Sequence, residues 1–240
     1  MFVQKILSQQ FSTGSPEWLV DMFFSKDSFP DKANYYSGEM LKDINDLTIG
    51  EELTGNGEIS FHQMDASNNK IIYSVQVSRD HSIIDFYCFL IKEGSNWKIE
   101  AVRRFLLPAF IYNVRDSLAQ INVLSSDDSV FFISVKLFTS EDYELKKYLK
   151  EHLNKFQELI SLFISNSKNQ ADKTLASVGC NAIYSDNKYP GCIFIQILKF
   201  ETMEVGFINA ADVELLPEIS VEEYIYIEEV VPGWFIFRVM

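Results

Sequence analysis

A small set of polar side chains in strand-like surroundings offers the best candidates for acid–base chemistry. Asp85 stands in an otherwise apolar segment, where burial would raise the pKa of its carboxyl group and suit it to act as a general base. Alternatively, Asp85 faces solvent or pairs with Arg103 or Arg104. Tyr87 shares a strand face with Asp85, and His62 is the histidine expected nearest to such a site. The predicted pocket residues are therefore His62, Asp85, Tyr87 and Arg103.

The sequence contains no recognisable motif for metal binding or for nucleophilic catalysis. The three histidines, His62, His81 and His152, lack metal-binding spacing and form no cluster with cysteine. No nucleophile elbow or phosphate-binding loop occurs. The unpaired spacing of the cysteines indicates reduced, buried thiols in a cytoplasmic protein; they are Cys88, Cys180 and Cys192. We therefore predict no catalytic group, no metal and no cofactor.

The charge of the chain narrows the classes of partner. The formal net charge is -13 at pH 7, and both halves of the sequence are acidic. Phosphate contacts require a basic surface, so we expect no binding to nucleic acid or to anionic lipid. The sequence has no secretory signal pattern and no uninterrupted apolar run of about 18 residues, so we expect no membrane span. A protein or a small apolar ligand therefore remains as the expected binding partner.

The segment Glu222–Glu229 is the most distinctive candidate for an interaction surface. In a strand, Tyr224, Tyr226 and Glu228 would share one face. Tyrosine is enriched at binding hot spots, so an exposed face of this kind could dock a basic partner. The alternative is a final hairpin whose carboxylates discourage edge-to-edge aggregation.

Hydrophobic periodicity in the first half predicts helices followed by an antiparallel meander. Ser15-Pro16-Glu17 is a favourable helix start. Alternation of apolar and polar residues, broken by polar turns, indicates strands. Helices are expected over 2–12, from Pro16 and near 33–47, a loop over 49–57, and strands over 58–64, 71–78, 82–91 and 97–102.

The second half repeats the order of helices and then strands. Leu107, Phe110, Ile111, Val114 and Leu118 have helical spacing and indicate an amphipathic helix. The polar segment 125–128 is the best candidate for a domain boundary. Residues 130–138 could be a strand or a helix. A long helix is expected over 145–163, and strands over 180–184, 192–200, 203–208, 224–231 and 234–240.

These elements predict an α+β fold with two modules, residues 1–123 and 129–240, each with helices followed by antiparallel strands. The turn and strand Gly94-Ser95-Asn96-Trp97-Lys98-Ile99, placed after helices and a meander, resemble the NTF2-like superfamily over residues 1–105. The resemblance implies a curved sheet around a helix, a cone-shaped pocket and dimerisation through an open sheet face. The acidic second half is loosely similar to bacterial immunity proteins.

Two functions follow as expectations. The first is a non-catalytic cytoplasmic protein that binds another protein, since no catalytic constellation is recognisable in the sequence. The second is an NTF2-like pocket that binds or transforms a small apolar molecule, with His62, Asp85, Tyr87 and Arg103 as its polar residues. A deep pocket around Asp85 favours the second function, and an exposed tyrosine–glutamate surface favours the first.

Overall fold

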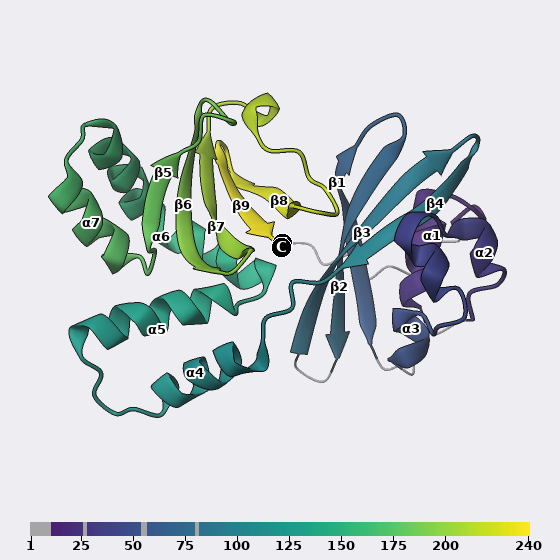
Figure 1. The fold of residues 1–240 in the computed structure, drawn as a ribbon, viewed down its shortest axis with the longest axis horizontal. Helices are drawn as coiled ribbons and strands as arrows, with labels where there is room; N and C mark the ends of the chain where they lie inside the picture. The colour runs from purple at the N-terminus through teal and green to yellow at the C-terminus, as the bar shows by residue number, and fades with distance from the viewer. Residues whose placement is uncertain (1–10, 26–27, 54–56, 80–81) are drawn as a thin grey trace. The chain divides into compact units, whose positions relative to one another are not determined.

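The chain folds into two compact units (Figure 1), described here from a computed structural model over residues 11–25, 28–53, 57–79 and 82–240. The units are Met1–Arg104 and Phe105–Met240. The division therefore falls after Arg104, earlier than the predicted boundary at residues 123–129. The segment 125–128, expected to be the boundary, begins a helix instead, because the Ser125 side chain accepts a hydrogen bond from the amide of Asp128. The predicted α+β class is confirmed.

The first unit contains a four-stranded antiparallel sheet in the order β1-β2-β3-β4. Its strands are β1 (Glu58–Ala66), β2 (Lys70–Arg79), β3 (Ser82–Glu93) and β4 (Asn96–Arg103). This is the predicted meander. Gly94 makes the tight turn into β4 at a φ of 63°, a conformation that glycine adopts without steric cost.

Short helices precede this sheet: α1 (Pro16–Phe24), α2 (Lys32–Tyr35), the 3-10 helix η1 (Gly38–Asp43) and α3 (Ile49–Glu52). The helix predicted over 33–47 is wrong, because Tyr36 is extended and Gly38 has a φ of 53°. The loop predicted over 49–57 begins with α3, which a Thr48–Glu51 capping box starts. The helix predicted over 2–12 falls almost wholly outside the described residues.

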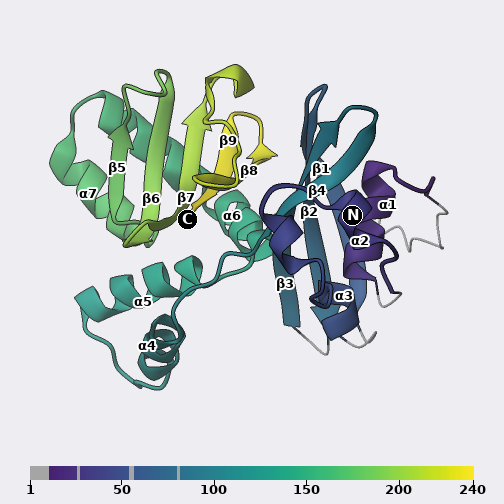
Figure 2. The same cartoon turned by 45° about the vertical axis from the view of Figure 1, so that its right-hand side comes forward.

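The helices of the first unit lie on one side of its sheet (Figures 1 and 2). Aromatic rings fill the space between the two layers. Trp18, for example, meets the rings of Phe29 and Tyr35 at centroid distances of 5.7 and 5.0 Å. Buried side chains of β2 and β3, including Tyr73 and Cys88, complete this core. The side of the sheet that the helices cover is therefore closely packed.

The helices of the second unit are α4 (Ala109–Ala119), α5 (Ser126–Phe138), α6 (Asp142–Ile164) and α7 (Lys168–Ser177). The ambiguous residues 130–138 are thus helical. The Ser125 cap and the acidic first turn of α5 favour a helix over the strand that alternation suggests. The predictions missed α7, which is largely polar and buries only Ala171 and Leu175. None of the described helices is both long and apolar enough to cross a membrane.

A five-stranded antiparallel sheet completes the second unit in the order β5-β6-β7-β9-β8. Its strands are β5 (Ala182–Ser185), β6 (Cys192–Phe200), β7 (Met203–Ala210), β8 (Tyr224–Val231) and β9 (Trp234–Val239). The connection from β7 to β8 contains the 3-10 helix η2 (Val213–Leu215). Because β9 lies between β7 and β8, the predicted final hairpin is present and β8 is an edge strand.

The long helix α6 crosses one face of this sheet, whereas α4 and α5 lie side by side as a helical hairpin (Figures 1 and 2). The ring of Phe156 in α6 meets those of Phe207 and Trp234 at 4.9 and 5.9 Å. Leu145, Leu149 and other residues of the same stripe of α6 are also buried. The two layers thus share one apolar core.

Candidate functional site

The predicted pocket residues all lie on one face of the first sheet. The strand register pairs His62 with Ser74, Ser74 with Tyr87, and Tyr87 with Arg103, which makes a row across the four strands. Asp85 lies two residues from Tyr87 on the same face. This face is opposite the one that the helices cover. The implied cone-shaped pocket would need space between helices and sheet, and aromatic side chains occupy that space.

The polar groups of this row already have partners in the fold. Asp85 is 5% exposed and accepts a 2.9 Å hydrogen bond from the Gln76 amide. Arg103 makes a two-pronged ion pair with Glu39 in η1, with one of its hydrogen bonds at 2.9 Å. The hydrogen bond from Arg103 lowers the pKa of the Glu39 carboxyl group. Arg103 therefore takes part in an ion pair, as expected of an arginine here, and Glu39 is a partner in it.

The expected exposed face of Tyr224, Tyr226 and Glu228 is wrong. Both tyrosines are buried, at 8% and 0% exposure. The Tyr226 hydroxyl donates to Glu228 Oε2 at 3.0 Å, and Lys146 Nζ of α6 donates to Glu228 Oε1 at 2.6 Å. The tyrosines are packed inside the unit because β8 meets neighbouring side chains on both faces. This segment contributes to the core of the unit.

Burial disfavours a nucleophilic role for the cysteine side chains. Burial raises the pKa values of the Cys88, Cys180 and Cys192 thiols above their ordinary value, which disfavours the thiolate. The His152 ring stacks on Tyr148 at 4.1 Å. His62 is exposed, and His81 lies outside the described residues. Within the described ranges, no group of three or more His, Cys, Asp and Glu residues could hold a metal ion.

Sequence reasoning missed a buried ion pair in the second unit. Arg238 of β9 donates from Nε to Asp142 Oδ1 at 2.7 Å and from Nη2 to the Ser140 carbonyl at 2.6 Å. Its guanidinium also lies over the Phe105 ring at 4.8 Å. These contacts hold the start of α6 against the sheet. No local sequence signal could reveal a pair whose members are 96 residues apart.

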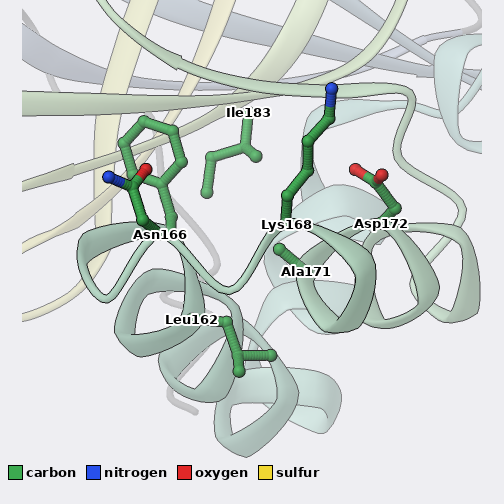
Figure 3. A pocket seen from close by; sticks show the side chains of 7 residues that line it. Leu162, Asn166, Lys168, Ala171, Asp172 and Ile183 are labelled. Atoms are coloured by element: carbon green, nitrogen blue, oxygen red, sulfur yellow. The ribbon is translucent and has the colours of Figure 1, made fainter.

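A small pocket of about 210 Å³ lies beside the end of α6, the start of α7 and β5 (Figure 3). Asn166 and apolar side chains line one side of it, and the side chains of Lys168 and Asp172 stand one helical turn apart at the other. Pockets for drug-sized ligands generally exceed about 300 Å³. This one can take a single side chain or a small fragment. Its lining residues are Leu162, Phe163, Asn166, Lys168, Ala171, Asp172 and Ile183.

The most distinctive surface feature of the second unit is the exposed side of α4. Phe110 is 50% exposed, Val114 36% and Ile121 51%. Their spacing of i, i+4 and i+11 places them on one side of the helix together with Ser117. We call these four residues the α4 face. Ile121 follows the helix end, where its amide bonds to the Leu118 carbonyl and continues the turn.

Further contacts of α4 with the rest of the unit lie on its opposite side. Ile111 is the residue that α4 buries, and Leu107 is buried just before the helix. Arg115 Nη1 donates to Thr139 Oγ1 at 3.3 Å, beside the end of α5. The sequence predicted the apolar spacing of this helix correctly. It did not predict that the helix leaves much of its stripe exposed.

The segment of sequence that contains the α4 face has few charged residues. From Phe105 to Ser126, the charged residues are Arg115 and Asp116, and they form an ion pair with each other at 2.8 Å. The polar neighbours of the face in this segment include Asn113 and Gln120, which are neutral. In a chain with a net charge of -13, this segment is therefore neutral overall.

Comparison with known proteins finds no protein-family model, no curated protein and no solved structure that matches this chain. The interpretation of its surfaces therefore rests on its own residues and geometry.

Proposed function

We propose that the chain is a non-catalytic interaction protein that binds a protein partner through the α4 face. The observation that carries this proposal is the exposure of Phe110 and Val114 on one side of α4, together with that of Ile121 just after the helix end. Contiguous exposed apolar surface marks interaction sites more often than chance, whereas scattered apolar residues are ordinary. An amphipathic helix that docks by such spacing is also a recurring recognition mode.

The energetics favour a partner for this surface. Full burial of a Val, Ile or Phe side chain contributes about 1.5–3 kcal/mol. The α4 face leaves Phe110 and Ile121 about half exposed, so covering it gains several kcal/mol before the cost of association. The helix is already attached to the unit through the buried Ile111 and through the contact of the Phe110 ring with Phe200.

A photo-crosslinking experiment tests the proposal. A photoreactive amino acid replaces Val114 on the α4 face, and the protein is irradiated in cells of the organism that encodes it. We expect one discrete crosslinked product, which the additional variant Phe110→Gln reduces strongly. Mass spectrometry of the product identifies the partner chain.

Val213 provides the matched control, because it is an exposed valine of the same unit that lies in η2. The photoreactive residue at position 213 should give no discrete product. If position 114 gives no product, or if both positions give the same set of products, the α4 face is not a binding surface.

A small-molecule site on the first sheet is the second candidate. It is supported by the register, which collects His62, Asp85, Tyr87 and Arg103 on one face. It ranks second because Asp85 and Arg103 are held by Gln76 and Glu39. If this candidate is correct, Asp85→Asn should weaken binding of small apolar compounds found by ligand screening, while Val114→Gln should leave it unchanged.

A further inference from the structure

We propose that the pocket beside α6, α7 and β5 binds a free α-amino acid with a branched apolar side chain, such as leucine. None of the residues that line this pocket belongs to the α4 face. The ligand site is therefore separate from the proposed surface for a protein partner.

The pocket forms where two helices meet the edge of the second sheet (Figure 3). Asn166 follows the end of α6 with a φ of 57°, a left-handed conformation that asparagine tolerates. Its amide donates to the Phe163 carbonyl at 3.1 Å, and the Ser167 amide donates to the Leu162 carbonyl at 2.9 Å. These bonds turn the chain so that α7 begins beside the last turn of α6. Because main-chain hydrogen bonds fix this turn, the pocket exists before a ligand binds.

The edge strand β5 provides the remaining wall. Ile183 pairs with Ile195 in β6, and Ile195 pairs with Phe207 in β7. Phe207 meets the ring of Phe156 in α6, so Ile183 lies on the face of the sheet that α6 covers. The sheet ends at β5, which leaves space between this strand and the two helices.

The α7 side of the pocket carries one positive and one negative charge. Within the described residues, neither the Lys168 ammonium nor the Asp172 carboxylate belongs to an ion pair. The first turn of α7 has no acidic residue that could neutralise Lys168. A lysine four residues before an acid is also the weaker order for pairing along a helix. Both charges are therefore available to a ligand.

A ligand with both charges matches this arrangement better than a ligand with one. The carboxylate of an α-amino acid can accept hydrogen bonds from Lys168, and its ammonium group can donate to Asp172. A simple anion is attracted by Lys168 but repelled by Asp172, and the reverse holds for a simple cation. The side-chain amide of Asn166, which both donates and accepts, can serve either group of the amino acid.

The apolar lining and the volume of the pocket specify the side chain of the ligand. A cavity of about 150 Å³ lined by aliphatic and aromatic groups holds a molecule of benzene. The volume of about 210 Å³ therefore holds roughly eight or nine non-hydrogen atoms, the size of free valine, leucine or isoleucine. For so small a ligand we expect a dissociation constant of roughly 0.1–10 mM. The apolar lining residues are Leu162, Phe163, Ala171 and Ile183.

Titration of the purified full chain with L-leucine, followed by NMR of isoleucine methyl groups, tests the inference. The Ile183 methyl signal should shift to saturation, whereas the signal of Ile121 in the α4 face should not move. Two related compounds each lack one charge: 4-methylpentanoate has no ammonium group, and 3-methylbutylamine has no carboxylate. Each should bind roughly five- to tenfold more weakly than leucine. Glycine, which lacks the apolar side chain, should also bind more weakly.

Three variants at exposed positions of α7 match these compounds. Asp172→Asn should weaken leucine binding roughly five- to tenfold without weakening the binding of 4-methylpentanoate. Lys168→Gln should weaken leucine binding to a similar extent without weakening the binding of 3-methylbutylamine. Lys173→Gln is the control, because Lys173 is outside the pocket lining, and it should leave leucine binding unchanged. A protein that is merely unfolded by a substitution would lose the binding of every compound.

Three results would overturn the inference. The first is an Ile183 signal that does not move up to about 50 mM leucine, a concentration above the expected dissociation constant. The second is equal binding of leucine and 4-methylpentanoate, since the ammonium group would then not be recognised. The third is an equal shift of Ile183 and Ile121, which would indicate non-specific binding. The proposed function does not depend on these results, because crosslinking at Val114 tests it separately.

Discussion

Two amphipathic helices of the second unit make opposite use of their apolar stripes. In α6, Leu149 and Phe156 are completely buried against the sheet. In α4, Phe110 and Val114 remain on the surface. Both sequences have the 3.6-residue period that indicates a covered helix face. Hydrophobic periodicity therefore indicates that one face of a helix is suited to burial. It does not indicate which element or molecule covers that face.

The environment of each helix explains the difference. Helix α6 has 23 residues and crosses the sheet, where the rings of Phe207 and Trp234 meet Phe156. Helix α4 has 11 residues and lies beside α5. The ring of Phe110 does meet the ring of Phe200 at 5.3 Å. Half of the Phe110 side chain nevertheless remains exposed.

The largest expected effect comes from truncating one phenylalanine in each helix. Phe156→Ala in α6 should lower the free energy of unfolding by about 4 kcal/mol, because it leaves a cavity in a core of aromatic rings. Phe110→Ala in α4 should cost about 1 kcal/mol or less, as expected for a largely exposed side chain. Urea unfolding of both variants measures the difference. Equal losses would show that α4 is part of the core, contrary to the comparison.

The next effect concerns the ion pairs that hold α6. Asp142→Asn should cost about 3 kcal/mol, because it leaves the buried Arg238 without its charge partner. Glu228→Gln disturbs the more exposed pair with Lys146 and should cost about 1 kcal/mol. Urea unfolding of the two variants at pH 7 compares them. A loss for Asp142→Asn no larger than that for Glu228→Gln would mean that burial does not govern the strength of these pairs.

The sequence indicated much of the architecture because local patterns determine it. Alternation and turn residues placed β6 and β8 with their observed bounds, and Ser15-Pro16 marked the start of α1. Residues 130–138 were ambiguous, since a short apolar run suits a buried strand or a buried helix. The Ser125 cap, together with the packing of Val135 and Phe138 in the folded unit, resolves that choice.

Candidate sites were harder to predict because exposure depends on contacts between distant segments. Tyr226 has the residue type of a binding hot spot, yet it is buried inside the unit. The pair of Asp142 and Arg238 joins residues that are 96 positions apart in the sequence. The apolar stripe of α4 was visible in the sequence, but its exposure follows from the limited contacts that α5 and Phe200 offer.

A third prediction sharpens the comparison through hydrogen exchange. Because α4 buries less of its surface than α6, its amides should exchange at least about tenfold faster than those of α6, a difference of about 1.4 kcal/mol in the free energy of opening. Mass spectrometry of exchanged peptides measures both helices in one sample. Equal exchange rates in the two helices would mean that α4 is held as firmly as α6, contrary to the comparison.

The smallest expected effect is the contribution of Tyr148 in α6 to stability at alkaline pH. Burial raises the pKa of its hydroxyl from 10.0 to about 12, with a smaller contribution from Cys180. The folded state therefore holds this proton more tightly than the unfolded state, so the stabilisation is complete below pH 10 and is lost as the pH rises towards 12. Tyr148→Phe cannot ionise, so the variant should lose about 1 kcal/mol less than the wild-type protein over that interval.

Urea unfolding at pH 8 and pH 11 measures this difference, and the pH 8 values serve as the control. The two proteins should agree there within about 0.5 kcal/mol, since Tyr148→Phe removes only the hydroxyl group. Ionisation of Tyr148, followed by its ultraviolet absorbance, should also begin at higher pH than in the urea-unfolded chain. If both proteins lose the same free energy of unfolding between pH 8 and pH 11, the Tyr148 hydroxyl group is in contact with water. Tyr148 would then belong to an exposed edge of α6, and the contrast with α4 would hold only for the stripe that contains Leu149 and Phe156.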